Sequence, residues 1–183
     1  MCNANHSGEN QMNIFVLDQD PIVAAQMHVD KHCVKMILEL TQQLTSAVRK
    51  HGATDKDVPL TKGGTPYKET HKNHPCTLFC GKTRSNFEWA AIHAEALCEE
   101  YTYRYEKRHA CQSAIEQLQS MSGIIPAGPM TNFALAMPDE YKVDSPSQSY
   151  RQYYWLDKRN AFKCVWTKRE VPYWWQENEK QTT

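Results

Sequence analysis

The longest helical pattern in the chain reads DPIVAAQMHVDKHCVKMILELTQQLTSAVRK and covers residues 20–50. Asp20-Pro21 begins it as an N-cap followed by a proline in the first turn, and His51-Gly52 ends it. Wound as one continuous helix, this stretch has a broad apolar arc on which Asp30 falls. A carboxylate there needs a partner or a raised pKa, unless the helix restarts and Asp30 is merely an N-cap. The pattern leaves both interpretations open.

Shorter patterns on either side of this stretch indicate further helices. A capping box at Ser85-Asn86-Phe87-Glu88 opens a helix with an apolar stripe that runs to Tyr105. Loops are expected at 52–70 and 123–129, and further helices at about 110–121 and 147–165. The apolar run at 13–17 predicts one short N-terminal strand. We therefore expect a mainly α fold, a compact helical bundle with that strand.

The composition bounds the class of protein. A chain of 183 residues with 40% hydrophobic and 23% charged residues fits one globular domain. We expect that domain at 12–176, between a disordered extension at 1–11 and a flexible tail at 177–183. No apolar run approaches the roughly 20 residues that span a bilayer, and no secretory signal is recognisable. The cysteines are odd in number and Cys33, Cys98 and Cys164 fall among apolar residues, which favours reduced thiols and a cytoplasmic protein.

The charge pattern neither requires nor excludes a nucleic-acid partner. The formal net charge is zero, which argues against a protein that coats polyanions. Between Tyr150 and Trp175, however, basic side chains alternate with aromatic ones, and only Asp157 and Glu170 oppose them. Basic groups neutralise phosphates and aromatic faces stack on bases. A C-terminal helix with buried aromatics and solvated lysines explains the same pattern equally well.

A first candidate site lies on the early helix. His28, His32, Lys35 and Glu39 are spaced by four, three and four residues, which keeps them in one polar stripe. Most such stripes are solvated surface. This one combines two imidazoles, an amine and a carboxylate, which together can share protons or hold an anion.

A second candidate site is the loop His71-Lys72-Asn73-His74-Pro75. Pro75 biases His74 toward an extended backbone, so that its side chain is presented rather than buried in a helix. Two imidazoles, an amine and an amide close together can bind a phosphate or orient a leaving group. As a lone motif its specificity is modest, because surface loops rich in lysine and asparagine are common.

Other motifs carry less weight. Gly81-Lys82-Thr83 resembles the end of a phosphate-binding loop, but Cys76 stands where the first glycine is required. Cys76 and Cys80 lack a second cysteine pair at zinc-finger spacing. His28 and His32 have the spacing of two metal ligands on one helix, with a third available from the His-Pro loop. Val29 stands where zinc hydrolases carry a glutamate, so a metal site is a minority alternative, and we expect neither a metal nor a cofactor.

Three segments carry a resemblance to a known family. Met12–Asp18, Asp30–Glu39 and Thr70–Pro75 resemble small phage and bacterial proteins grouped with the pyrimidine-dimer DNA glycosylases. Similar stretches at 99–105, 136–141 and 150–154 extend the resemblance over most of Met12–Trp175. The chain is also similar to anti-phage glycosylases that remove glucosylated hydroxymethylcytosine. The resemblance implies a compact helical protein that cleaves an N-glycosidic bond in DNA. We expect the protein to act as a monomer.

The resemblance also implies roles for individual residues. In the family's classical members a glutamate of the first helix supports the chemistry, and Glu39 is the nearest match. Those members use the amine of a processed N-terminus as nucleophile; here a polar leader precedes Met12. The expected reaction is therefore hydrolysis by water that leaves an abasic site, with Lys35 as the one nearby candidate for an imine.

A mechanism consistent with both candidate sites follows. Asp30 or Glu39 would stabilise the oxocarbenium-like sugar and activate water, and His71, Asn73 or His74 would accept charge on the departing base. The target base must leave the stack and enter a pocket. The expected DNA-binding side chains, from the helices, the loop and the aromatic stretches, are His28, Lys31, His32, Lys72, Tyr101, Tyr103, Arg104, Arg151, Tyr153 and Tyr154.

Two other classes of function fit the same residues. A group transferase or pyrophosphorylase-like enzyme of phage DNA hypermodification would need the same base pocket and a second small-molecule site. A non-catalytic DNA-binding protein would make the polar stripe a solvated face, so that loss of both carboxylates would leave its activity intact.

Overall fold

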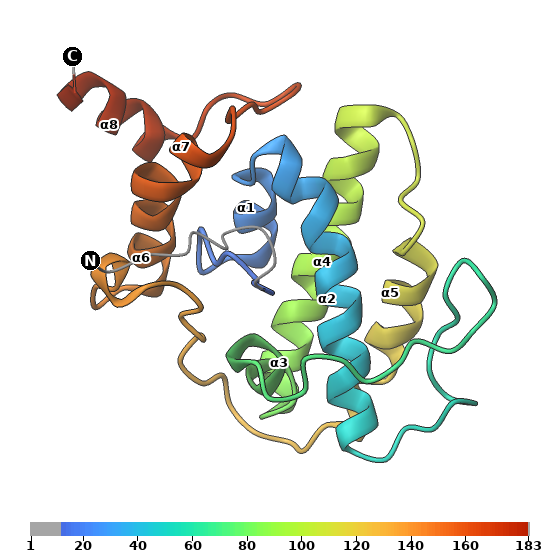
Figure 1. The fold of residues 1–183 in the computed structure, drawn as a ribbon. Coiled ribbons are helices and arrows are strands. Elements are labelled where there is room, and N and C mark those ends of the chain that lie inside the picture. Colours follow the sequence, from blue (N-terminus) through green and yellow to red (C-terminus); the bar gives the residue numbers. More distant parts are fainter. Residues whose placement is uncertain (1–11, 183) are drawn as a thin grey trace, which may run out of the picture.

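Two long helices, α2 (Asp30–Lys50) and α4 (Arg84–Tyr105), run side by side through the centre of the molecule (Figure 1). The computed structural model describes residues 12–182. Helix α1 (Pro21–Gln26) packs on α4, while α3 (Pro75–Cys80) and α5 (Gln112–Ser120) each contact both long helices. The expected mainly α fold is confirmed.

The helices of the C-terminal third, α6 (Pro146–Tyr153), α7 (Arg159–Ala161) and α8 (Tyr173–Thr182), lie together at one side of the molecule (Figure 1). Helix α6 continues through a π-helical turn, η3 (Tyr154–Lys158), into α7. The helix expected at 147–165 therefore ends earlier. Helix α8 includes the residues from 177 that were expected to form a flexible tail. Two 3-10 turns, η1 (Ser122–Ile124) and η2 (Asp139–Tyr141), complete the elements.

Side-chain caps explain where the helices begin. The Asp20 carboxylate accepts hydrogen bonds from the backbone N–H groups of Ile22 and Val23, which confirms the predicted N-cap of α1. The chain then breaks, and α2 restarts at Asp30 with Val29 as its N-cap, so Asp30 is the first helical residue and not the cap. The predicted capping box was misplaced, because Thr83 and not Ser85 caps α4.

The apolar run at 13–17 is buried but forms no strand. The described residues contain no strand, only an isolated bridge between Leu60 and Pro66. Without a partner strand, the run bonds to side chains instead. The backbone N–H groups of Ile14 and Phe15 donate to Oδ1 of Asn13, at 2.8 and 3.2 Å, and Phe15 adopts a left-handed φ of 53°.

One hydrophobic core unites these elements. It extends from Ile14 through Leu40, Phe87 and Ile115 to Trp175, so the described chain has a single core. The described cysteines are free thiols, and burial raises the pKa of Cys33 and of Cys98 to about 12. None of the helices described here combines the length and apolarity needed to cross a bilayer.

Candidate active site

A row of polar side chains on one face of α2 is covered by other segments of the chain. Glu39, Gln43 and Ser46 follow at spacings of four and three residues, and all are buried. Gln43 Nε2 donates to the Asn13 carbonyl at 3.0 Å, and Ser46 Oγ donates to the Thr70 carbonyl at 2.9 Å. The helix thereby holds both the N-terminal segment and the start of the His-Pro loop. The predicted polar stripe continues into this buried row.

Glu39 is the carboxylate of this row. Its Oε2 accepts a hydrogen bond from the Asn13 backbone N–H at 2.9 Å, and its Oε1 lies 3.3 Å from Lys35 Nζ. The Glu39 side chain is 10% exposed, against 41% for Lys35. Burial raises the pKa of Glu39, although Asn13, Lys35 and His71 all act to lower it. A raised pKa makes a carboxylate better suited to accept and return a proton during a reaction.

The start of the His-Pro loop is held against α2, because Ser46 binds the Thr70 carbonyl. The exposed His71, in a left-handed backbone conformation with φ 46°, is within electrostatic range of Glu39. His74 is half-buried and caps α3, since its Nδ1 accepts from the Cys76 backbone N–H at 3.2 Å. Burial, with a smaller contribution from His71, lowers the pKa of His74. Neutral His74 with an accepting Nδ1 carries its proton on Nε2, so it is a hydrogen-bond donor.

A cavity of about 390 Å³ opens beside His74. Its other walls are Pro75 and the extended segment Leu135–Pro138. That segment is fixed from behind: Asn13 Nδ2 donates to the Ala136 carbonyl at 2.8 Å, and the Tyr150 hydroxyl donates to the Ala134 carbonyl at 2.8 Å. The cavity is of the size that small ligands occupy. Asn13 connects it directly to Glu39.

A second, narrow void of about 20 Å³ lies beside Lys35. The His32 ring stacks on Phe15 there, and its Nδ1 lies 2.5 Å from the Tyr154 hydroxyl. Burial, reinforced by Lys158 and Lys35, lowers the pKa of His32 to about 3, so this imidazole is neutral. Tyr153 also lines the void, with the Lys158 ammonium 4.4 Å from its ring centre. His32 and Tyr153 thus line this void together with Lys35 but are buried, and the buried Tyr154 lies behind His32.

Asp30 is not part of this site. Its carboxylate is bound by Arg104 at 3.0 Å, by the Thr167 backbone N–H at 3.0 Å and by the Thr167 hydroxyl at 2.6 Å. Arg104 is itself buried and also donates to the carbonyls of Gln26 and His28. Of the two carboxylates expected as alternatives for the chemistry, Asp30 is therefore engaged elsewhere. Asp30 and Arg104 join α4 to the break between α1 and α2.

His28 also lies outside the polar stripe. It precedes α2, is fully buried, and its Nδ1 is 2.8 Å from the Ala24 carbonyl. His28 and His32 therefore do not share one helical face, as the minority metal interpretation required. Among residues 12–182, no group of three or more histidine, cysteine or acidic side chains is arranged to hold a metal ion.

The remaining predicted DNA-binding residues are spread over the surface. Lys72 and Asn73 are exposed on the His-Pro loop, and Lys31 lies over the Phe162 ring. Tyr103 donates to the Lys168 carbonyl, far along α4 from the cavity beside His74. Tyr101 packs against Tyr105 and His109. Lys35 pairs with Glu39, and His71 acts electrostatically on both Glu39 and His74, whereas Tyr101 and Tyr103 pack elsewhere.

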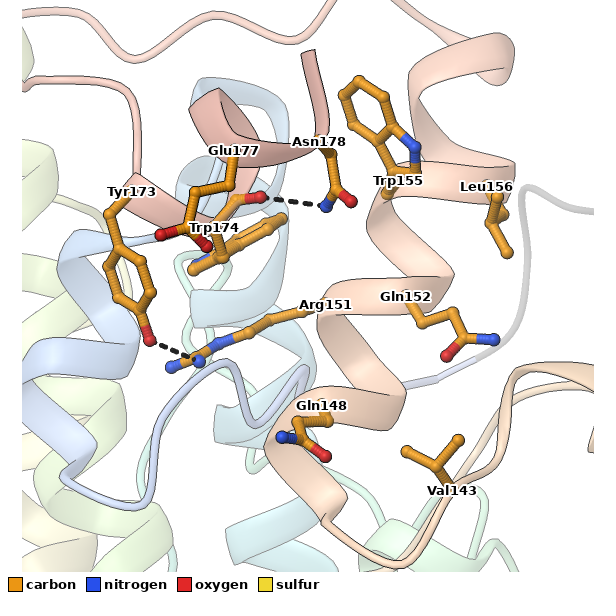
Figure 2. Close-up of a pocket in the computed structure, with 10 residues that line it drawn as sticks. All are labelled: Val143, Gln148, Arg151, Gln152, Trp155, Leu156, Tyr173, Trp174, Glu177 and Asn178. Atoms are coloured by element: carbon orange, nitrogen blue, oxygen red, sulfur yellow. Dashed lines mark hydrogen bonds between the residues drawn. The ribbon is translucent and has the colours of Figure 1, made fainter. Parts of the chain in front are cut away.

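A larger cavity of about 650 Å³ lies between α6 and α8 (Figure 2). Arg151 points into it, but its guanidinium is already bound to the Leu17 carbonyl, the Asp18 carboxylate and the Tyr173 hydroxyl. Arg151 is therefore neutralised and is a poor phosphate ligand. The other polar lining residues are amides and the exposed Glu177, without a histidine or lysine to share a proton. The chemistry favours the smaller cavity.

Sequence reasoning missed two residues that build the site, Asn13 and Tyr150. Both are buried and act through backbone carbonyls far away in sequence, at Ala136 and Ala134. Asn13 stood within the first stretch that carries the family resemblance, but nothing in its local pattern distinguishes it. No protein-family model, curated protein or solved structure matches this chain.

Proposed function

We propose that this protein is a DNA glycosylase that hydrolyses the N-glycosidic bond of a modified pyrimidine and leaves an abasic site. One observation carries the proposal: a buried carboxylate with a raised pKa, Glu39, is bonded through Asn13 to the wall of a cavity that His74, a donating imidazole, also lines. The sequence resemblance to the pyrimidine-dimer DNA glycosylases supports the same reaction. The first substrate to test is glucosylated hydroxymethylcytosine in phage DNA.

Glu39 would act on the sugar. As the C1′–N bond breaks, the deoxyribose acquires oxocarbenium character, and a nearby carboxylate stabilises that charge. The same carboxylate can take a proton from the attacking water, whose oxygen forms the new bond to C1′. The positive charge of Lys35 lowers the pKa of Glu39, in opposition to burial.

The His-Pro loop would act on the departing base. The base leaves with the electron pair of the C1′–N bond, so donors that face it lower the barrier. His74 offers its Nε2–H beside the cavity, and the exposed His71 is close enough to Glu39 to serve the same nucleotide. The proton released by water returns to the base, which balances the reaction.

DNA would approach over the exposed cations around this site. Lys31, Lys35 and Lys72 lie on α2 and the His-Pro loop, where they can neutralise phosphates that flank an extruded nucleotide. Extrusion of the base costs a few kcal/mol, and a modified base that stacks poorly would reduce that cost. The apolar wall of Leu135 and Met137 would receive the face of the base.

The test is product analysis by mass spectrometry with plain, hydroxymethylated and glucosylated DNA. We expect a free base and an abasic site from at least one modified DNA, and none with Glu39→Gln. Glu99→Gln, the same change at an exposed site of α4, is the matched control. A product in which a group has been added to intact DNA would indicate a transferase. DNA binding without any product would leave a non-catalytic binding protein.

A further inference from the structure

Asn13 uses its hydrogen-bonding groups in two directions. Its backbone N–H donates to Glu39 Oε2 at 2.9 Å, and its carbonyl accepts from Gln43 Nε2 at 3.0 Å. Its side-chain Nδ2 donates to the Ala136 carbonyl at 2.8 Å, 123 residues away in sequence. The side-chain Oδ1 accepts from the next two backbone N–H groups. The residue is 2% exposed, so these contacts are shielded from water.

The two directions join the carboxylate of α2 to the wall of the cavity. The main chain of Asn13 bonds to α2 at Glu39, and its side chain bonds to the Leu135–Pro138 wall of the cavity beside His74. We propose that Asn13 is a positioning residue, which fixes the distance between the carboxylate and the base cavity and thereby helps to select the base. This inference rests on the proposed glycosylase function.

Asparagine is the side chain this position requires. It has an amide donor for the Ala136 carbonyl and, on the same short chain, an oxygen for the N–H groups of Ile14 and Phe15. Ionised aspartate has no donor, so it would face the Ala136 carbonyl with a second oxygen and add a negative charge close to Glu39. Alanine would remove both side-chain contacts but would keep the backbone N–H that binds Glu39.

Substitution of Asn13 by alanine and by aspartate therefore tests its contacts with the cavity wall and with Glu39 separately. Asn13→Ala releases the wall while keeping the Glu39 contact, so we expect a kcat about 10-fold lower and weaker discrimination between pyrimidines. Asn13→Asp places like charges side by side, so we expect it to raise the pKa of Glu39 further and to move the acid limb of the kcat profile to higher pH. Asn132→Asp makes the same change at an exposed position of the loop that carries the cavity wall. It should change neither the discrimination between pyrimidines nor the pH profile.

The experiment combines kcat against pH with NMR titration of the ¹³C-labelled Glu39 carboxyl group in the wild type and the three variants. The NMR readout does not need a substrate. If the wild type releases no base from any DNA, the proposed function fails. A shift of the Glu39 titration in Asn13→Asp would still establish that Asn13 acts on Glu39. If base is released but Asn13→Asp, folded by circular dichroism, leaves both the pH profile and the Glu39 titration unchanged, the positioning role is wrong.

Discussion

The two carboxylates of α2, Asp30 and Glu39, sit on one helix and have opposite surroundings. Asp30 is surrounded by donors: a buried guanidinium, a backbone N–H and a hydroxyl. Glu39 has one backbone N–H and a half-exposed lysine, and burial raises its pKa. A carboxylate whose two oxygens are both bound by several donors joins segments together. One with fewer donors and a raised pKa is better suited to exchange a proton.

The largest expected effect is on activity, at Glu39. Glu39→Gln keeps the shape and an acceptor for the Asn13 N–H but removes the charge, so kcat for base release should fall about 10³-fold. Stability should hold or rise slightly, because a buried charge is lost. Single-turnover kinetics tests the expected fall in kcat, and a thermal melt tests the expected stability. Base release within a few-fold of the wild type would show that Glu39 is not the catalytic carboxylate.

The next effect is on stability, at Asp30. Asp30→Ala leaves Arg104 with fewer partners in a buried position and frees the Thr167 groups, so unfolding should become easier by about 3 kcal/mol. For a chain of this length that lowers the Tm by roughly 10 °C. At a temperature where the variant is folded, kcat should stay within a few-fold. Asp144→Ala, at an exposed site, is the control. A stable but inactive Asp30→Ala protein would show that Asp30 acts in catalysis and not in stability.

The same two residues mark what sequence alone could predict. The cap at Asp20 follows from signals within a few residues, and the structure confirms it. The break before Asp30 was one of two interpretations that the pattern left open, and the structure decides between them. The partner of Asp30 could not be found this way, because Arg104 lies 74 residues further on. The sequence could not show whether the polar stripe was exposed to solvent or part of a buried site, because that depends on the segments that pack over it. Those segments are irregular backbone at Asn13 and Thr70.

Errors at element ends have a similar cause. Thr83 and Ser85 both fit as caps two residues apart, and the choice was made by tertiary contacts, since Ser85 Oγ bonds to the Gly128 carbonyl. The run at 13–17 has strand composition, but strand formation needs a partner strand, and α2 side chains bind its backbone instead. Helix α8 was missed although Trp174 and Trp175 bury themselves in the core.

His74 tests whether Glu39 acts with the loop. His74→Asn should preserve the cap of α3, because asparagine is a good N-cap, while the imidazole that lines the cavity is lost. Stability should therefore change little, and kcat should fall about 10²-fold with a small change in KM. His74→Ala loses the cap as well and should also melt earlier. Equal kcat in the wild type and His74→Asn would remove the imidazole from the mechanism.

Acid should destabilise the folded protein through two buried histidines. His28 and His93 are fully buried 5.2 Å apart, and burial lowers the pKa of His93 to about 4 and that of His28 well below 6.5. Both rings prefer the neutral form in the folded state. Their stabilisation is thus complete above pH 6.5 and is lost as the pH falls toward 4. The Tm should drop by roughly 5 °C or more between pH 7 and pH 5. The exposed His71→Gln variant should show the same drop, and a flat profile in the wild type would contradict the burial argument.

The smallest effect separates the two cations that pair with the carboxylates. Arg104 is buried, whereas the Lys35 side chain is 41% exposed and solvent screens its charge. Lys35→Met should therefore change stability by no more than about 0.5 kcal/mol. It should still raise the pKa of Glu39 and move the acid limb of kcat to higher pH, because a positive neighbour is lost. Borohydride should trap no wild-type protein on DNA if water is the nucleophile. A trapped adduct that disappears with Lys35→Met would instead make Lys35 the imine-forming residue and turn its pairing with Glu39 into a nucleophile–base pair.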